Sequence, residues 1–264
     1  MASSPASTVW AGDVEHATVR FYGDLADLAR GLDRDATVTV PLGTSRSVKD
    51  VLEAVGVPHT EVGLLIVGDG PVGFDHLVSA GERIAAYPPS PMLEVPGLLR
   101  TTEPAARFVL DVHLGTLARN LRLLGFDSWY RTDADDPLLA EVAVAGSRVL
   151  LTRDRGLLMR REIVHGHCVR SQDPFTQTVE VARRFGLGPR LRPFSRCLAC
   201  NGELVDVDRG SVLAEVPPLA RDAERFSRCT ACDRVYWPGT HHQHLAGLVA
   251  SVRRSLADDL GGGT

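Results

Sequence analysis

Two apolar runs that each lead to an aspartate constrain the fold of this chain more than any other feature. The run at 108–110 leads to Asp111, and the run at 149–151 leads to Thr152 and then Asp154. Apolar runs without polar alternation are typical of parallel strands that are buried on both faces. In an open α/β sheet, ligands gather at the carboxyl ends of such strands. We therefore predict that Asp111 and Asp154 lie at the same edge of a parallel sheet.

The segment between the two runs carries two helical patterns. Leucine and alanine recur at helical spacing from Leu114 to Leu124, and Gly125 follows as a carboxy-terminal cap. After a short strand at 128–130, a second helix is predicted, with Asp135 or Asp136 as its N-cap. This order of elements predicts an α/β domain whose parallel sheet is flanked by helices.

Asp111, Asp136 and Asp154 form the first candidate site, with Asp135 as a further candidate ligand. Carboxylates that converge at one sheet edge repel one another, so such a cluster usually holds a hard divalent cation. Mg²⁺ and Mn²⁺ prefer oxygen ligands and can activate water for displacement at phosphorus. The set therefore predicts a metal-dependent phosphodiesterase. The alternative is that each aspartate only caps a strand end or a helix, which is the commoner role of a single Asp.

The same stretch resembles the PIN-like ribonuclease family that is named after the carboxy-terminal domain of the Mut-seven exonuclease. The resemblance lies in FVLDVHLGTLARNLRLLGFD and ADDPLLAEVAVAGSRVLLTRDRGL, and extends from about Phe108 to His244. It implies a PIN-like fold that cleaves RNA, with Mg²⁺ or Mn²⁺ held by Asp111, Asp136 and Asp154. PIN nucleases often have a fourth acid, and three residues are candidates for it: Asp135, Asp127 and Glu141.

Five residues are predicted to contact RNA: Arg119, Arg122, Arg153, Thr152 and His241. Arg119 and Arg122 are expected to project from the outer side of the first helix, and Thr152 is expected to support the site from its strand end. A helix with a basic face is also predicted at 155–161. Such arginines can bind the backbone of a single strand. A solvated helix face is an equally good explanation.

Two C-x-x-C motifs predict a second metal site. Cys197 and Cys200 form the first motif, Cys229 and Cys232 form the second, and 28 residues separate them. Paired motifs of this kind give the closed four-cysteine arrangement of a structural zinc ribbon. In an intracellular chain disulfides are not expected, which favours zinc binding by these cysteines. Such a zinc ion should contribute folding energy rather than catalysis. The aromatic pair at 236–237 is expected to belong to the ribbon core, with stacking on RNA bases as the alternative.

The amino-terminal part predicts a small α+β module. Its strands and one helix are similar to the ubiquitin-like β-grasp module of the sulfur-carrier type, through SVKDVLEAVGVPHTEVGLLIVGDG and SAGERIAAYPP, over about Ala17 to Pro88. Sulfur carriers end in a free Gly-Gly, whereas this chain continues past the module, so sulfur transfer is not expected. A binding role for a protein partner and a purely structural role remain equally open.

Composition and charge agree with a globular protein of several parts. The hydrophobic content is 44%, and no segment is expected to cross a membrane or to direct export. The net charge is −6 over the first 100 residues and +2 over the rest, which weakly favours the second part as the one that meets a polyanion. We expect five segments: a disordered tail (1–14), a ubiquitin-like β-grasp domain (15–88), a Pro-rich linker (89–106), a PIN-like nuclease domain (107–190), and a zinc ribbon with a carboxy-terminal helix (191–260).

Taken together, the sequence predicts a cytoplasmic metal-dependent ribonuclease, with endonucleolytic and exonucleolytic cleavage both left open. Its cofactors are predicted to be Mg²⁺ or Mn²⁺ for catalysis and Zn²⁺ for structure, and its partner to be single-stranded RNA. A homodimer is plausible because PIN-like domains often pair. The alternative is a non-catalytic RNA-binding or adaptor protein, in which the ribbon and the β-grasp module recognise partners and the acids are vestigial.

Overall fold

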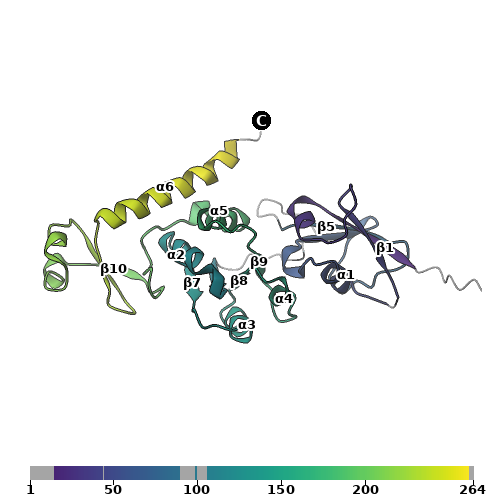
Figure 1. Cartoon of the computed structure of the whole chain (residues 1–264), viewed down its shortest axis with the longest axis horizontal. Coiled ribbons are helices and arrows are strands. Elements are labelled where there is room, and N and C mark those ends of the chain that lie inside the picture. The colour runs from purple at the N-terminus through teal and green to yellow at the C-terminus, as the bar shows by residue number, and fades with distance from the viewer. Residues whose placement is uncertain (1–14, 44, 90–98, 100–105, 262–264) are drawn as a thin grey trace, which may run out of the picture. The chain divides into compact units, whose positions relative to one another are not determined.

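The computed structural model describes residues 15–43, 45–89, 99 and 106–261. These residues form two compact units, which are described separately (Figure 1). Unit 1 contains the described residues up to Pro89 together with Leu99, and unit 2 contains those from Ala106 onward. The predicted tail at 1–14 and most of the predicted linker, at 90–98 and 100–105, lie outside the described residues.

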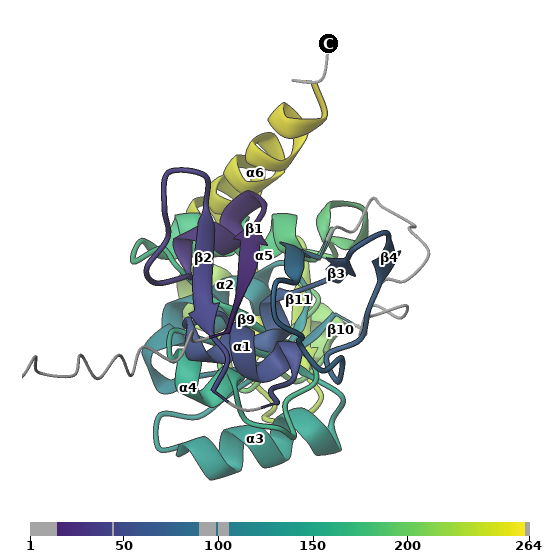
Figure 2. The ribbon, with the colours of Figure 1, turned by 90° about the vertical axis from the view of Figure 1, so that its right-hand side faces the viewer.

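Unit 1 is built on a five-stranded sheet with the order β2-β1-β5-β3-β4. The strands are β1 (His16–Phe21), β2 (Thr37–Pro41), β3 (Leu64–Val67), β4 (Gly70–Pro71) and β5 (Arg83–Tyr87). β1 pairs with β5 in parallel, and the other neighbouring strands are antiparallel. Figure 2 shows β1 and β2 side by side in this unit. The predicted α+β pattern is therefore present.

Helix α1 (Val48–Ala54) supplies much of the core of unit 1, because Val48, Val51 and Leu52 are fully buried. The Ser47 hydroxyl accepts a hydrogen bond from the Asp50 amide, and the Asp50 carboxylate accepts one from the Ser47 amide. This reciprocal pair confirms the predicted capping box. Two short 3-10 helices, η1 (Gly23–Asp27) and η2 (His59–Glu61), complete the unit.

Unit 2 is built on a four-stranded parallel sheet with the order β7-β6-β8-β9. The strands are β6 (Arg107–Leu110), β7 (Asp127–Tyr130), β8 (Val149–Thr152) and β9 (Gly166–Cys168). The two predicted apolar runs are thus the two central strands, and their residues from Phe108 to Leu110 and from Val149 to Leu151 are almost completely buried. The predicted parallel sheet is confirmed.

Helices cover both faces of this sheet (Figure 1). They are α2 (Gly115–Leu123), α3 (Asp136–Ala145), α4 (Arg155–Leu158) and α5 (Pro174–Arg184), with the 3-10 turn η3 (Val112–Leu114) before α2. α2 and α5 pack with Phe108 and Leu110, whereas α3 and α4 cover the opposite face. Helix α4 is shorter than predicted: it ends at Leu158, and the Arg160 guanidinium pairs with Glu162 instead of continuing a basic helix face.

A cysteine-bearing three-stranded antiparallel sheet and a long helix complete unit 2. The strands are β10 (Leu204–Val207), β11 (Phe226–Cys229) and β12 (Val235–Tyr236), and three 3-10 turns accompany them: η4 (Gly188–Arg190), η5 (Arg209–Ser211) and η6 (Pro218–Ala220). Helix α6 (Thr240–Gly261) packs on α5 and buries Val249 and Val252 in the core of the parallel-sheet domain. Trp237 packs against the small apolar core of the ribbon, as expected. Over the described part of the chain, no helix combines the length and apolar character needed to cross a bilayer.

Candidate functional site

Asp111, Thr152 and Asp154 are joined at the carboxyl edge of the parallel sheet. Leu110 of β6 lies opposite Leu151 of β8, so Asp111 and Thr152 are also neighbours across the two strands. The Thr152 hydroxyl donates to Asp111 Oδ2 over 2.7 Å, and the Asp154 amide donates to Thr152 Oγ1 over 2.9 Å. Thr152 is fully buried and Asp111 is 9% exposed. The side chain of Thr152 therefore fixes the orientation of the Asp111 carboxylate.

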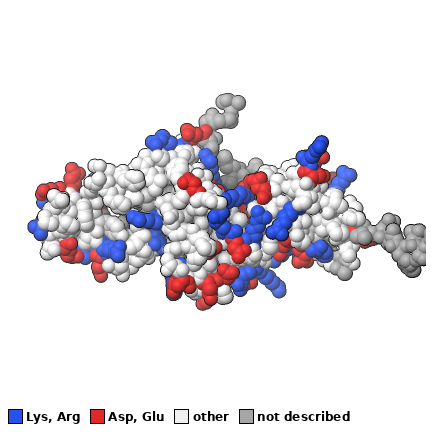
Figure 3. All heavy atoms as spheres, in the orientation of Figure 1, with Lys and Arg blue, Asp and Glu red and all other residues white. Residues whose placement is uncertain are grey.

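The other predicted acids lie at helix starts. Asp154 Oδ1 accepts from the Gly156 amide over 2.7 Å at the start of α4. Asp135 is the N-cap of α3, and its carboxylate accepts from the Leu138 amide over 3.0 Å. Asp136 is the first residue of α3 and is exposed. Figure 3 shows acidic side chains gathered over α3. Of the two N-cap candidates that the sequence left open, the structure assigns Asp135.

The carboxylate oxygens of Asp111, Asp136 and Asp154 lie further apart than the ligand atoms of a metal ion usually do. Among the described residues, only the four cysteines place three or more ligand atoms within 4.8 Å of one another. Asp111 and Asp154 are bridged by Thr152, and Asp136 belongs to the helix that connects β7 to β8. Mg²⁺ keeps several bound waters and commonly takes only one or two carboxylates from a protein. A hydrated ion therefore suits this spacing better than a fully dehydrated one.

Asp127, a candidate for the fourth acid, lies at the wrong edge of the sheet. It is the first residue of β7, whereas Asp111 follows the last residue of β6. Arg148 donates two hydrogen bonds to its carboxylate over 2.7 and 3.1 Å, and Asn201 Nδ2 donates a third over 2.7 Å. Burial alone would raise the pKa of Asp127, but these donors outweigh it and lower the pKa to about 2. The prediction for Asp127 was wrong, because this carboxylate is a structural ion-pair partner.

Glu141 is exposed in α3. No hydrogen bond or ion pair ties it to another described residue.

The four cysteines come together as predicted. Sγ of Cys197 lies 3.7 Å from Sγ of Cys232, and Sγ of Cys200 lies 3.3 Å from Sγ of Cys229. All four sulfur atoms lie within 4.8 Å of one another. Sulfur atoms around a tetrahedral zinc ion with bonds of ~2.3 Å are ~3.8 Å apart. The cluster could therefore bind a metal ion such as zinc.

The acid–base properties of the cluster also favour a cation. Burial raises the pKa of the Cys197 thiol, but the Tyr236 hydroxyl at 3.0 Å and the Cys200 and Ala199 amides stabilise the thiolate and lower the pKa to about 6. Burial, together with the neighbouring thiols, raises the pKa of Cys200 to about 12. Four crowded thiols cannot all ionise alone, whereas a bound divalent cation allows it. Cys168, the remaining cysteine, is buried in β9 outside the cluster.

Arg122 does not project outward as predicted. Its side chain is buried: Nε donates to the Ser128 carbonyl over 2.9 Å, and Nη1 donates to the carbonyls of Leu198 and Ala199 over 3.2 and 3.0 Å. The last two carbonyls lie between the cysteines of the first C-x-x-C motif. Arg122 therefore fastens this motif to the parallel-sheet domain and is not available for RNA.

Asn201 makes a second connection between the cysteine motif and the sheet. Its Oδ1 accepts from the Ser128 amide over 2.9 Å, and its Nδ2 donates to Asp127 over 2.7 Å. Asn201 has a positive φ of 71°. Asn201 was not among the residues predicted from the sequence. The available signal was an asparagine directly after a C-x-x-C motif, where the left-handed conformation is common for Asn.

A groove lies between the cysteine-bearing sheet, the start of α6 and the exposed side of α2. Its volume is about 970 Å³, and the residues that give it its character are Arg119, Arg225, Arg234, Phe194, Trp237 and His241. Arg119 Nη2 lies 3.2 Å from His241 Nε2, and the ring of His242 stacks on Phe194 at 4.3 Å. We call this hollow the aromatic groove. Two predicted RNA contacts, Arg119 and His241, line it, whereas Thr152 and Arg153 belong to the acidic edge.

Comparison with known proteins identifies the family. A family model described as the Mut7-C RNase domain matches residues 106–249, which is more than half of the chain. The chain belongs to the Mut7-C RNase domain family. A second model, described as the Mut7-C ubiquitin domain, matches residues 14–94. The resemblance predicted from the sequence motifs is therefore confirmed for both parts. The Mut7-C RNase match spans the acidic edge as well as all four cysteines, and it supports a ribonuclease-type hydrolase with an RNA substrate.

No curated protein matches the Mut7-C chain. Two crystal structures of small archaeal modifier protein 1 from Haloferax volcanii match part of the chain. One is 20% identical, with 29% of this chain and 99% of that chain covered and a TM-score of 0.24. The other is 19% identical, with 29% and 97% covered and a TM-score of 0.24.

Proposed function

We propose that this Mut7-C chain hydrolyses RNA phosphodiester bonds at the acidic edge of a PIN-like parallel-sheet domain. The observation that carries the proposal is the hydrogen-bonded series from Asp111 through Thr152 to Asp154 at the carboxyl ends of two central strands. Ligands and substrates of open α/β sheets bind at this edge. A buried carboxylate that is oriented by a threonine is pre-organised for a cation or for a water molecule.

The acids leave oxygen atoms available for Mg²⁺ or Mn²⁺. Thr152 occupies Oδ2 of Asp111, and the start of α4 occupies Oδ1 of Asp154. The other oxygen of each carboxylate, and both oxygens of Asp136, have no hydrogen-bond donor among the described residues. Hard cations prefer such oxygen ligands. When bound, the ion lowers the pKa of water and neutralises charge that develops on the phosphate.

The remaining predicted residues take supporting roles in this proposal. Arg153 is exposed between Thr152 and Asp154, so its guanidinium can contact the phosphate that is cleaved. Arg119 and His241 contact the strand further away, in the aromatic groove, where single-stranded bases can stack on aromatic rings. Asp135 caps α3 through Oδ1. With its other carboxylate oxygen, Asp135 remains a candidate for a fourth acid, as does Glu141.

The cysteine cluster is proposed to hold one structural Zn²⁺. The four sulfur atoms complete a closed coordination sphere, which leaves no open position for a reacting group. Arg122 and Asn201 fasten one cysteine motif to the sheet domain. Zinc binding therefore stabilises the wall of the aromatic groove as well as the ribbon itself.

Binding of Mn²⁺ tests the acidic site without relying on cleavage. The electron paramagnetic resonance signal of free Mn²⁺ is titrated with the zinc-loaded protein. We expect Asp111→Asn to bind Mn²⁺ at least ~10-fold more weakly than the wild type, because it removes one charged ligand. Asp133→Asn removes an exposed carboxylate that pairs with Arg131, and it serves as the control. Equal Mn²⁺ affinity of the wild type and Asp111→Asn would contradict the proposed ligand set.

A non-catalytic RNA-binding protein is the second candidate function. The wide spacing of the aspartates and the presence of the aromatic groove favour it. In that case RNA binding is independent of divalent cations and no products form on prolonged incubation.

With either function, the ubiquitin-like unit is proposed to contact a protein partner. The protein is further proposed to be cytoplasmic and to form a homodimer. Analytical ultracentrifugation tests the dimer.

A further inference from the structure

A second hollow lies at the amino edge of the parallel sheet, opposite to the acidic edge. Its volume is about 620 Å³, and four arginines line it: Arg107, Arg190, Arg192 and Arg196. The edge is identified by Arg107, which is the first residue of β6, and by Asp127, which is the first residue of β7. We call this hollow the arginine pocket.

The positive charge of the arginine pocket is only partly balanced by carboxylates of the protein. Asp127 is the only acid in its lining, and its carboxylate is already engaged by Arg148 and by Arg107. Arg190 and Arg192 form no ion pair within the described part of the chain. The nearest carboxylate to Arg196 belongs to Glu203, 3.8 Å away and 74% exposed, which is a weak surface pair. The pocket therefore attracts an anion from solution.

Backbone contacts hold the segment that carries Arg192 against the end of α2. The segment around Arg192 lies across the end of α2: the Arg192 amide donates to the Leu124 carbonyl over 3.0 Å, and the Phe194 amide donates to the Leu123 carbonyl over 2.9 Å. Gly125 has a φ of +97°, and a Cβ atom there would collide with the Arg192 carbonyl oxygen. Close approach of this segment thus requires glycine.

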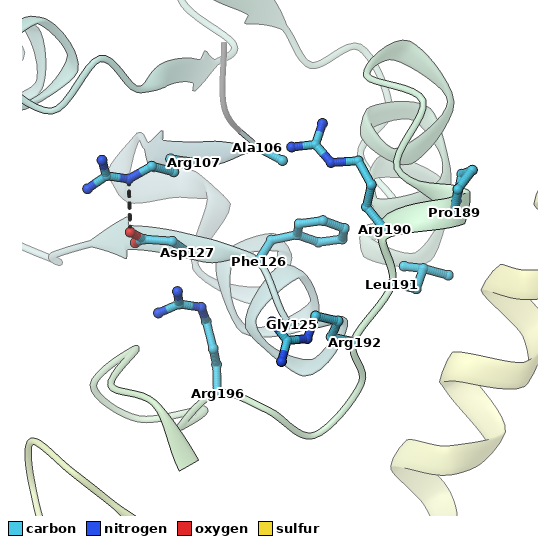
Figure 4. A pocket seen from close by; sticks show the side chains of 10 residues that line it. All are labelled: Ala106, Arg107, Gly125, Phe126, Asp127, Pro189, Arg190, Leu191, Arg192 and Arg196. Carbon is cyan, nitrogen blue, oxygen red and sulfur yellow. Dashed lines mark hydrogen bonds and ion pairs between the residues drawn. The ribbon is translucent and has the colours of Figure 1, made fainter. Parts of the chain in front are cut away.

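Alternation along the same segment directs its side chains. Leu191 packs against the core of the sheet domain, so its neighbours Arg190 and Arg192 are exposed to solvent. Figure 4 shows Arg107 and Arg196 on either side of Asp127, and Arg190 and Arg192 on opposite sides of Phe126. Phe126 itself is only 5% exposed, so it offers no face on which a base could stack. The chemistry of the pocket suits phosphate groups, because planar guanidinium groups pair with phosphate oxygens.

We propose that the arginine pocket binds consecutive phosphates of an RNA strand that continues from the aromatic groove. Arg196 lines both hollows, so they adjoin at one side chain. Four arginines around one hollow match the several charges of a polyanion better than the charge of a single phosphate. The inference rests on the proposed function only in taking RNA as the polyanion. It adds that the strand is held by its backbone at the edge of the sheet that lies away from the acids.

The test measures RNA binding separately from cleavage. Fluorescence anisotropy follows a labelled 12-nucleotide single strand at 50 to 200 mM KCl, with all proteins carrying Asp154→Asn and with no divalent cation added. The variant is Arg190→Ala with Arg192→Ala. The control is Arg253→Ala with Arg254→Ala, which removes the same charge from two exposed arginines of α6. Circular dichroism and zinc content verify that both variants are folded.

We expect the pocket variant to bind RNA at least ~5-fold more weakly and to lower the slope of log Kd against log salt by ~1.4, since each phosphate contact to a single strand contributes ~0.7. The control should keep the slope of the parent. Equal slopes for the pocket variant and the parent overturn the proposal. Displacement of the RNA strand by adenosine 5′-monophosphate at the same concentration as the strand also overturns it, because a single phosphate would then bind as well as the strand. If the wild type does not cleave RNA but the arginine pocket binds it as expected, the proposed function is contradicted and the proposal for the arginine pocket is retained.

Discussion

Thr152 donates its hydroxyl hydrogen to Asp111 across two neighbouring strands, at an Oγ1 to Oδ2 distance of 2.7 Å. Thr152→Val keeps the shape of this buried side chain but removes the donor. We expect kcat/KM for RNA to fall at least ~10-fold and stability to fall by about 1 to 2 kcal/mol, because a buried carboxylate loses its partner. Thr152→Ser retains the hydroxyl and should retain most of the activity. Unchanged kinetics in Thr152→Val would show that the orientation of Asp111 is irrelevant to cleavage.

The buried guanidinium of Arg122 predicts a large effect on stability. Arg122→Met fills a similar volume but leaves the carbonyls of Ser128, Leu198 and Ala199 without their donor. We expect the free energy of unfolding to fall by about 3 kcal/mol. Urea denaturation followed by tryptophan fluorescence measures it. Arg119→Met, on the exposed side of the same helix, is the matched control and should stay within ~0.5 kcal/mol of the wild type.

Zinc is predicted to be part of the folded structure. Mass spectrometry of the metal content should find about one Zn²⁺ per chain in the wild type. Cys232→Ser should lose the metal and unfold at lower temperature, because metal binding is coupled to folding. Cys168→Ala changes a cysteine outside the cluster and should keep the zinc. A purified wild-type protein that is folded without any bound metal would contradict the site.

The ion pair of Asp127 predicts a specific loss of stability in acid. Its pKa is lowered from 3.8 to about 2, so the folded state favours the ionised carboxylate. The stabilisation is complete above about pH 4 and disappears as the pH falls toward 2. Its size is roughly 2 kcal/mol, for a side chain that is 16% exposed. Acid also releases zinc, so the measurement is the difference between the stability curves of the wild type and Asp127→Asn. That difference should shrink between pH 4 and pH 2.

The elements that follow local rules were predictable from sequence. The two apolar runs became the central strands β6 and β8, the pattern from Leu114 to Leu124 became η3 and α2, and Ser47 with Asp50 became a capping box. Each of these depends on periodicity or on hydrogen bonds between near neighbours. The two C-x-x-C motifs were equally informative, because four thiolates share few geometries other than a closed metal site.

The two predictions that were wrong, for Arg122 and Asp127, concern residues whose partners are far away in sequence. Arg122 is on the polar side of its helix, and it is buried only because the segment around Leu198, 76 residues later, folds over it. Asp127 takes its partners from Arg148 and from Asn201, which are 21 and 74 residues away. A charge that is paired by such non-local contacts has the same sequence pattern as a free charge. Periodicity therefore could not separate structural charges from those available to RNA.

Cleavage of labelled single-stranded RNA by the wild type, Asp154→Asn and Asp208→Asn is the most direct test of the proposed metal-dependent ribonuclease activity. Asp208 matches Asp154 in its local role, because each carboxylate accepts from the amide of a glycine two residues later over 2.7 Å. Asparagine can preserve both caps, and zinc content is checked in every sample. We expect products from the wild type and Asp208→Asn with Mg²⁺ or Mn²⁺ and none without, and at least ~100-fold slower cleavage by Asp154→Asn. Cleavage by Asp154→Asn at the wild-type rate, or cleavage that is independent of divalent cations, would contradict metal-dependent catalysis at the acidic edge.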